Sequence, residues 1–119
     1  MTEIRNTKKY DLEDRTFKYS KKITDYLKVL SKSMINSEIS KQLFRSSCSV
    51  GANYIEANEA LSRKDFVMRI KICRKECKES IYWLKLIEDE DSSKEYLMRE
   101  ATELMKIFGS ILEKCKDKV

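Results

Sequence analysis

Histidine, proline and glycine are the residues that this sequence lacks or nearly lacks. Its 119 residues include no histidine, no proline and two glycines, Gly51 and Gly109. Tight turns draw mostly on proline and glycine, so their scarcity argues against a hairpin-rich sheet and favours helices. Histidine is the commonest general base near neutral pH, and without it Ser46, Ser47 and Ser49 have no evident activator. We therefore predict that the protein is not an enzyme and that these serines pack or cap helices.

Long apolar runs are missing as well, and none approaches the roughly 20 residues that a membrane span requires. Residues 1–10 are polar and charged, unlike a signal peptide, so we expect a cytoplasmic protein without membrane contact. Four cysteines lie inside helical patterns and are expected to be reduced thiols: Cys48, Cys73, Cys77 and Cys115. Cys73 and Cys77 are one helical turn apart, but a zinc site would need a second such pair. No metal and no cofactor is predicted.

Four segments with helical periodicity are separated by short polar breaks. The predicted helices cover approximately residues 11–33, 37–61, 64–89 and 93–116, and residues 1–10 are expected to be flexible. Three residue pairs have the spacing of helix starts: Ser62 with Asp65, Ser92 with Glu95 and, more weakly, Asp11 with Asp14. Short connections make sequential helices antiparallel neighbours. The sequence therefore predicts one all-α domain over 1–119, an antiparallel up-down-up-down four-helix bundle.

Each predicted helix carries an apolar seam in which steps of four and three residues alternate, so that one stripe faces its neighbours. The seams comprise Ile23, Leu27, Leu30 and Met34; Leu43, Ser47, Val50, Tyr54, Ala57 and Leu61; Phe66, Ile70, Cys73, Cys77, Ser80, Leu84 and Ile87; and Leu97, Ala101, Leu104, Phe108, Ile111 and Cys115. The second seam is lined by small and polar groups, which predicts that this helix approaches its neighbours closely.

The third predicted helix has a second stripe: Ile72, Glu76, Glu79, Trp83 and Leu86. One interpretation is a contact between subunits anchored by Trp83, since large aromatic side chains dominate interface energetics. The alternative is a wide core-facing side that buries Trp83 within the monomer. The carboxylates then need partners, and the candidates are Arg45, Asn53, Arg69 and Lys75. Glu56, Glu76 and Glu79 could bind a hard cation through oxygen, but nothing fixes a geometry, so we predict structural roles for them.

Positive charge is concentrated in two places. The formal net charge is +5, and residues 1–50 carry 11 basic and 6 acidic groups. The first predicted helix is a basic surface that includes Lys18, Lys21, Lys22 and Lys28. In the third, lysine recurs every seven residues along a ridge of about 31 Å, reinforced by an arginine and a fifth lysine: Lys64, Lys71, Arg74, Lys75, Lys78 and Lys85.

Such a ridge could follow the phosphates of RNA or DNA, and the alternative is a solvated outer face. Four aromatic residues offer only scattered stacking surfaces: Tyr10, Tyr19, Tyr26 and Trp83. With no base-reading motif in the sequence, we expect binding that is electrostatic and tolerant of nucleic-acid sequence.

Several stretches of the chain share a pattern with a known family. They are Arg45-Ser46, Ser49–Ala57 (SVGANYIEA), Ser62–Phe66 (SRKDF), Lys75–Leu84 (KECKESIYWL) and, near the start, Tyr10–Leu12 with Arg15–Phe17. In these stretches the chain resembles the four-helix-bundle proteins encoded in intervening sequences of bacterial 23S ribosomal RNA genes. Small residues, often Ala, are usual in that family where Cys73 and Cys77 stand here.

The resemblance implies a bacterial homo-oligomer, a ring of five bundles, with a role in nucleic-acid binding and no enzymatic activity. Related bundles serve as accessory proteins to the reverse transcriptases of diversity-generating retroelements. The family's signature positions are Asn53, Glu56, Lys75, Glu76, Glu79, Tyr82 and Trp83 in this sequence. We therefore expect a non-enzymatic oligomeric bundle that binds RNA or DNA through its basic surface. The alternative is a protein-interaction scaffold, or a reverse-transcriptase accessory protein, without direct nucleic-acid binding.

Overall fold

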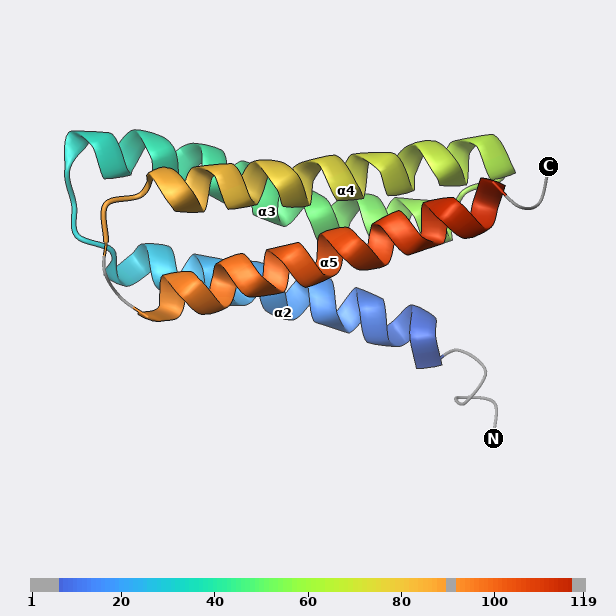
Figure 1. The fold of residues 1–119 in the computed structure, drawn as a ribbon, viewed down its shortest axis with the longest axis horizontal. Coiled ribbons are helices and arrows are strands. Elements are labelled where there is room, and N and C mark those ends of the chain that lie inside the picture. The colour runs from blue at the N-terminus through green and yellow to red at the C-terminus, as the bar shows by residue number, and fades with distance from the viewer. Residues whose placement is uncertain (1–6, 90–91, 117–119) are drawn as a thin grey trace.

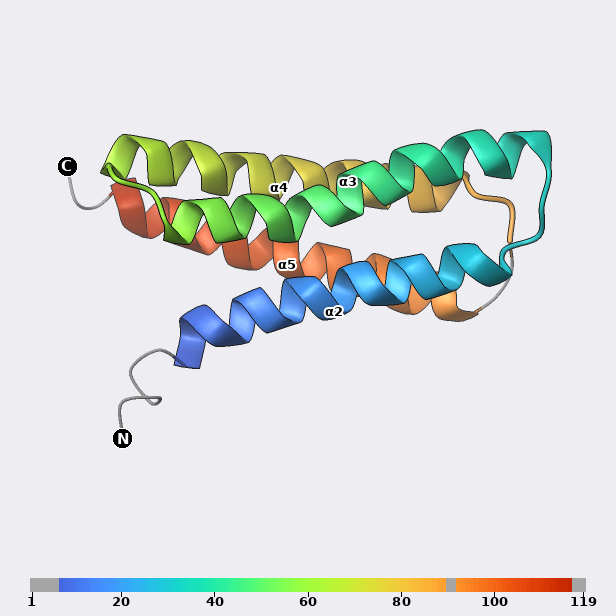
Figure 2. The same ribbon diagram turned by 180° about the vertical axis from the view of Figure 1, so that it is seen from behind.

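Four antiparallel helices form the part of the chain that the computed structural model describes, residues 7–89 and 92–116, with side chains from residue 12 onward. They are α2 (Thr7–Val29), α3 (Met34–Asn58), α4 (Arg63–Leu86) and α5 (Ser92–Lys116). Each helix packs beside the one before it, and α2 returns to α5 (Figures 1 and 2). Within the described residues the backbones of α2 and α4 are not neighbours, nor are those of α3 and α5, so these pairs are diagonal and meet only through core side chains such as Tyr54 and Phe108. The predicted up-down-up-down bundle is confirmed.

Most helix ends differ from the predicted positions by a few residues. α2 already includes residues 7–10, which were expected to be flexible, while residues 1–6 lie outside the described part. α3 begins earlier because the Ser33 side chain caps it, accepting a 3.0 Å hydrogen bond from the Asn36 amide. Ser62 caps α4 as predicted, accepting from the Asp65 amide at 3.0 Å. Ser92, predicted as a cap, is instead the first residue of α5.

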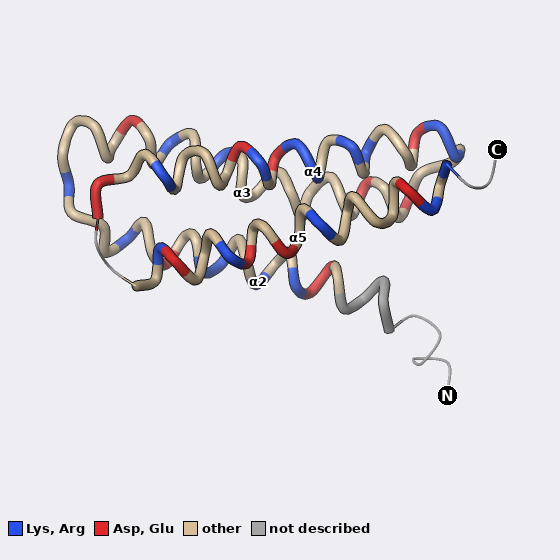
Figure 3. The backbone as a smooth tube through the Cα atoms, viewed as in Figure 1, with Lys and Arg blue, Asp and Glu red and all other residues tan. Residues whose placement is uncertain are grey.

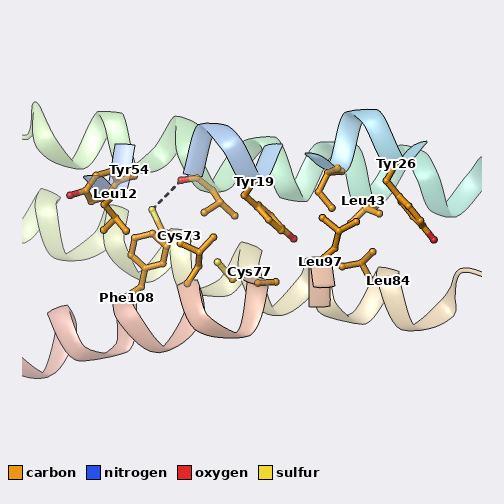
Figure 4. Packing of buried hydrophobic residues seen from close by; sticks show 14 of the residues in the cluster. Leu12, Tyr19, Tyr26, Leu43, Tyr54, Cys73, Cys77, Leu84, Leu97 and Phe108 are labelled. Carbon is orange, nitrogen blue, oxygen red and sulfur yellow. Dashed lines mark hydrogen bonds between the residues drawn. The ribbon is translucent and has the colours of Figure 1, made fainter. Parts of the chain in front are cut away.

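The core follows the predicted seams of α3 and α4 closely, and that of α2 less well. On α2 the buried stripe is Leu12, Thr16, Tyr19, Ile23, Tyr26 and Leu30. Tyr19 and Tyr26 therefore point into the bundle, where Figure 4 shows them among Leu43, Leu84 and Leu97. The prediction that these two tyrosines offer exposed stacking surfaces was wrong, because they continue the four-three spacing of the buried stripe.

Seam positions at the helix ends also differ from the prediction. Met34 is 83% exposed because α2 has ended before it, and Leu61 is fully exposed in the connection after α3. On α5 the stripe passes from Phe108 to Leu112, while Ile111 and Cys115 are only half-buried. A straight helix drifts by about 20° per heptad from a strict seven-residue repeat. Because of that drift, Leu112 is the buried residue near the end of α5 in place of Ile111.

Close packing of α3 against α2 depends on the small residues predicted for α3. A Cβ atom on Gly51 would lie 3.2 Å from the Thr16 Oγ1 atom, closer than ordinary van der Waals contact. The Ser20 hydroxyl donates a 3.2 Å hydrogen bond to the Ser47 carbonyl oxygen. Glycine at position 51 thus allows a helix approach that a larger residue would oppose.

The two connections at one end of the bundle are joined by Asn36, which is buried at the start of α3. Its Nδ2 atom donates to the Ser31 carbonyl at 3.1 Å and to the Glu88 carbonyl at 3.4 Å. Its Oδ1 atom accepts from the Glu88 amide at 3.2 Å. These bonds satisfy backbone groups beyond the helix ends, and no spacing in the sequence had pointed to this residue.

Two of the four thiols are predicted to be unreactive in the folded protein. Burial raises the pKa of Cys73 to about 12 and raises that of Cys77 as well, whereas Cys48 and Cys115 are half-buried. Because the thiolate is the nucleophile, a chromogenic disulfide reagent should label Cys48 and Cys115 much faster than the other two. In denaturant all four should react at similar rates. Rapid labelling of all four in the folded protein would contradict the buried placement.

The same burial predicts a loss of stability in alkaline solution. Cys73 has its ordinary pKa of 9.0 when unfolded and about 12 when folded, so the unfolded state releases its proton first. The free energy of unfolding should therefore be unaffected below about pH 9 and fall from about pH 9 to about pH 12. Urea titrations at several pH values measure this, and Cys73→Ala should flatten the slope.

Candidate nucleic-acid interface

Basic side chains run along the solvent side of α4, at the spacing found in the sequence. All six predicted positions on this helix are exposed: Lys64, Lys71, Arg74, Lys75, Lys78 and Lys85. Figure 3 shows basic positions recurring along α4 and along the neighbouring α5. Four of the six, Lys71, Arg74, Lys75 and Lys78, line hollows between α4 and α5. The ridge is therefore one wall of a groove whose other wall is α5.

Two adjoining hollows lie between α4 and α5, with volumes of about 730 and 460 Å³. Both are lined by Arg74, Lys78 and Glu113, so we treat them as one surface, the α4–α5 groove. Its basic lining residues are Lys71, Arg74, Lys75, Lys78, Lys106, Lys114 and Lys116. The remaining lining residues are Met105, Gly109, Ser110, Leu112 and Glu113. Seven cations thus surround a single carboxylate.

Most of these cations have no partner among the described residues. The carboxylate of Glu113 pairs with Lys116 at 3.1 Å. The other six basic side chains of the groove make no ion pair or hydrogen bond within the described part of the chain. Like charges held together in this way repel one another and raise the local positive potential. A polyanion bound in the groove would relieve that repulsion.

The basic residues on the α5 side of the groove were not predicted from the sequence. Lys106, Lys114 and Lys116 lie in the part of the chain whose charges balance, so a count of signs gives no signal there. The one usable clue is that Lys114 and Lys116 occupy the last turn of α5, where cations suit the helix dipole. Only the antiparallel packing of α4 and α5 places them beside the α4 ridge.

The basic residues of α2 form a separate surface. α2 and α4 are diagonal, so the two predicted lysine sets do not meet. Lys18 pairs with Asp14 at 2.9 Å, and the Lys22 Nζ atom donates to the Tyr96 hydroxyl at 3.1 Å and lies 4.6 Å from its ring centroid. Lys21 and Lys28 are exposed. Two of these four lysines are thus already engaged, so α2 is the weaker candidate.

On its other side α4 presents carboxylates to α3. Glu76 is buried, and its partner is the predicted Arg45, whose Nη1 atom lies 3.4 Å from both Glu76 carboxylate oxygens. The Nη2 atom of Arg45 donates to Glu79 Oε1 at 2.7 Å. Desolvation opposes the charge on Arg45, but the hydrogen bonds and charges of Glu76 and Glu79 outweigh it and raise its pKa. One guanidinium thus neutralises much of the acidic stripe.

The remaining candidates for pairing have other roles. Asn53 accepts a 3.0 Å hydrogen bond from Arg69 and donates to Ser49, so it links α3 to α4. Lys75 lines the α4–α5 groove and not the acidic side. Glu56 is exposed on α3, whereas Glu76 is buried on α4. Among the described residues no three His, Cys, Asp or Glu side chains gather as a metal site.

Trp83 and Tyr82 lie near the C-terminal end of α4, between its buried and its exposed sides. Trp83 is half-buried and packs against the core, and its Nε1 atom is covered without a hydrogen-bond partner. The interpretation that its own monomer covers Trp83 is therefore supported in part. Tyr82 is 57% exposed and meets Trp83 edge-on with ring centroids 5.0 Å apart. Together with the exposed Leu86 it leaves an apolar surface on α4.

Comparison with known proteins identifies the class of this bundle. The model of the 23S rRNA-intervening sequence protein family matches residues 8–114. The chain belongs to that family, as its residues had indicated. None of the helices in the described part is long and apolar enough to cross a bilayer.

A solved structure agrees with this placement. It is a protein of unknown function from the S23 ribosomal protein family of Bacteroides thetaiotaomicron, with 31% sequence identity and a TM-score of 0.77. The match covers 89% of this chain and 98% of that one. No curated protein matches significantly.

The ion pair of Arg45 with Glu76 and Glu79 should stabilise the fold. Arg45→Met leaves the Glu76 carboxylate buried without a counter-charge, and we expect it to lower the free energy of unfolding by about 2 kcal/mol. The loss is smaller than for a fully buried pair because Arg45 is itself 51% exposed. Denaturant titration measures it, with Glu79→Gln as a control that should cost less than about 1 kcal/mol.

A double variant sharpens this test. Adding Glu76→Gln to Arg45→Met removes the stranded charge and should restore part of the loss. Addition of a chelator should change neither stability nor assembly. Unfolding on metal removal, or equal losses for Arg45→Met and Glu79→Gln, would contradict the structural role.

Proposed function

We propose that this protein is a non-enzymatic, oligomeric bundle that binds RNA or DNA through the α4–α5 groove. The observation that carries the proposal is the groove's composition, seven cations around one carboxylate that is itself paired. Lysine and arginine bind phosphates through charge and hydrogen bonds, and each contact releases condensed counterions. The family membership supports the proposal without specifying an activity.

Recognition in this groove would be insensitive to base sequence. No aromatic side chain lines it, so bases have no platform on which to stack. Both walls are helices, and six of the seven basic side chains are lysines, which act as flexible point charges. Such a surface contacts phosphates, which carry no sequence information directly. We therefore expect similar affinities for unrelated strands of equal length.

A non-enzymatic role agrees with the side chains that might otherwise react. Burial raises the pKa of the Cys73 and Cys77 thiols, which keeps them protonated at neutral pH. Glu76 is committed to Arg45. The serines Ser46 and Ser80 are hydrogen-bonded to each other at 3.0 Å in the core, away from solvent. These groups are explained by packing.

Assembly into a closed ring would strengthen the binding. Tyr82 and Leu86 are exposed on α4 on the side away from the core, where a second copy could cover them. A ring satisfies every heterologous contact, while an open chain does not. Several grooves held in one ring would act on the same strand, and linked sites bind far more tightly than single ones.

A protein-interaction scaffold, including an accessory protein to a reverse transcriptase, is the second candidate. It is favoured by three exposed apolar side chains around the α2–α3 connection: Val29, Met34 and Ile35. A partner protein could cover this surface, since exposed apolar patches mark contact sites. The two functions use different surfaces, so they are separable by mutation.

Reversing the charge of the groove should abolish nucleic-acid binding. The triple change of Lys71, Lys75 and Lys78 to Glu should lower affinity for RNA or DNA at least about 100-fold at low salt, because each lost phosphate contact weakens binding. For about four contacts, wild-type affinity should follow salt with a log-log slope of roughly −3.6 for duplex and −2.8 for single strands. Fluorescence anisotropy across salt concentrations measures both quantities.

The matched control places the same charge change on α2 and on the connection that follows it. Lys21, Lys28 and Lys32 to Glu alters net charge equally on exposed residues of the opposite corner. Affinity should then fall far less. If this control loses binding and the α4 triple does not, the site moves to α2. If wild-type protein retains no RNA or DNA at low salt, the scaffold function is favoured.

Assembly should depend on the exposed aromatic surface. Wild-type protein at micromolar concentration should be a discrete oligomer by light scattering, and Tyr82→Ala with Leu86→Ala should shift it toward monomer without loss of helicity. Trp83→Ala should also weaken assembly, but with reduced stability because Trp83 packs against the core. Tyr96→Ala, at an exposed tyrosine on α5, is the control. A monomeric wild type would contradict the ring.

A further inference from the structure

Gly109 occupies a position in α5 that intramolecular packing does not explain. It lies well inside the helix, where glycine is less favourable than alanine because its backbone loses more freedom on folding. A Cβ atom built there would meet nothing within 4 Å. The position also has no positive φ that would call for glycine. Nothing in the described fold therefore requires a missing side chain at this point.

The other glycine provides the contrast. Gly51 is explained by the fold, since a Cβ atom would lie 3.2 Å from Thr16 Oγ1. Both residues are helical, and both leave a gap on the helix surface. At Gly51 the gap holds a neighbouring helix, and at Gly109 it opens into the α4–α5 groove.

We propose that the gap at Gly109 receives the sugar-phosphate backbone of a nucleic-acid strand, which lies along the groove against α5. The inference rests on the proposed function and specifies where the strand makes its closest approach. Arg74 and Lys78 of α4 and Lys106 and Lys114 of α5 line the same hollow as Gly109. A phosphate over the glycine therefore has cations on both sides.

The absence of a side chain at position 109 lets the strand approach the surface of α5 closely. Coulomb attraction falls with separation, so a strand that lies closer to both basic walls is held more strongly. A side chain at position 109 would hold the strand away from the helix surface and lengthen the distance to both basic walls. The neighbouring Ser110, which also lines the groove, carries a hydroxyl that can donate to a phosphate oxygen.

A second copy of this chain suits the gap less well than a polyanion. The chain carries a net charge of +5, and the groove presents six cations without partners among the described residues. Docking another positive molecule there would leave those charges unrelieved, at a cost that complementary charge avoids. The charge of the groove therefore favours a phosphate chain as the occupant.

Two substitutions at this position test the inference. Gly109→Ala should raise Tm by a few degrees, since alanine favours the helix and meets no neighbour, and should lower affinity by up to about threefold, since its methyl group is a small obstacle. Gly109→Gln should weaken binding of a homopolymeric RNA or DNA strand about tenfold and reduce the salt slope by about one, as expected for a lost phosphate contact. Ala52→Gln, a similar enlargement on the exposed face of the diagonal helix α3, should change neither.

Each other result would overturn the inference in a distinguishable way. Wild-type affinity for Gly109→Gln, together with lost binding in the groove charge reversal, would leave the proposed function standing and remove Gly109 from the site. A changed oligomer mass in Gly109→Gln would show that a second copy occupies the gap. A lowered Tm in Gly109→Ala would show that the position is covered. If the wild-type protein binds no strand, the proposed function fails with it.

Discussion

The rotation of α4 about its own axis is the constraint on which the rest of the structure depends. α4 is packed between α3 and α5, and its fully buried stripe includes Ile70, Cys73, Cys77 and Leu84. Burying that stripe sets every other side of the helix. The lysine ridge is turned toward α5, and the carboxylates are turned toward α3. A rotation of one residue, about 100°, would bury lysines and expose the core.

This orientation separates charge across one helix. On the α3 side a single guanidinium, Arg45, joins Glu76 and Glu79, so the acidic stripe is largely neutralised where it lies. On the α5 side six of the seven cations of the groove have no such partner among the described residues. If the carboxylates were not neutralised, their negative charge would weaken the positive potential of the groove. The ion pair thus stabilises the α3–α4 contact and also keeps the carboxylates from screening the basic surface.

Different elements could be predicted from the sequence to different degrees. The bundle class and the α4 seam follow from periodicity, because Phe66 to Ile87 keep an unbroken four-three spacing. The lysine ridge follows from the same repeat. Tyr19 and Tyr26 were misjudged because a tyrosine suits a core as well as a surface, and only the neighbouring helices decide. Asn36 gave no signal, since its role depends on two loops, and it reaches one of them through Glu88, which is 52 residues away in sequence.

The sequence by itself determined which residues share a face of each helix, because that depends only on 3.6 residues per turn and on which side chains water excludes. It also determined that α4 bears opposite charges on its two sides. Only the tertiary structure decided which faces meet. Lys106 and Lys114 join Arg74 and Lys78, α2 is excluded from the groove, and Gly109 opens into it. These relations depend on the rotation and axial offset of one helix against another, which arise from side-chain packing between helices and leave no periodic trace in either one.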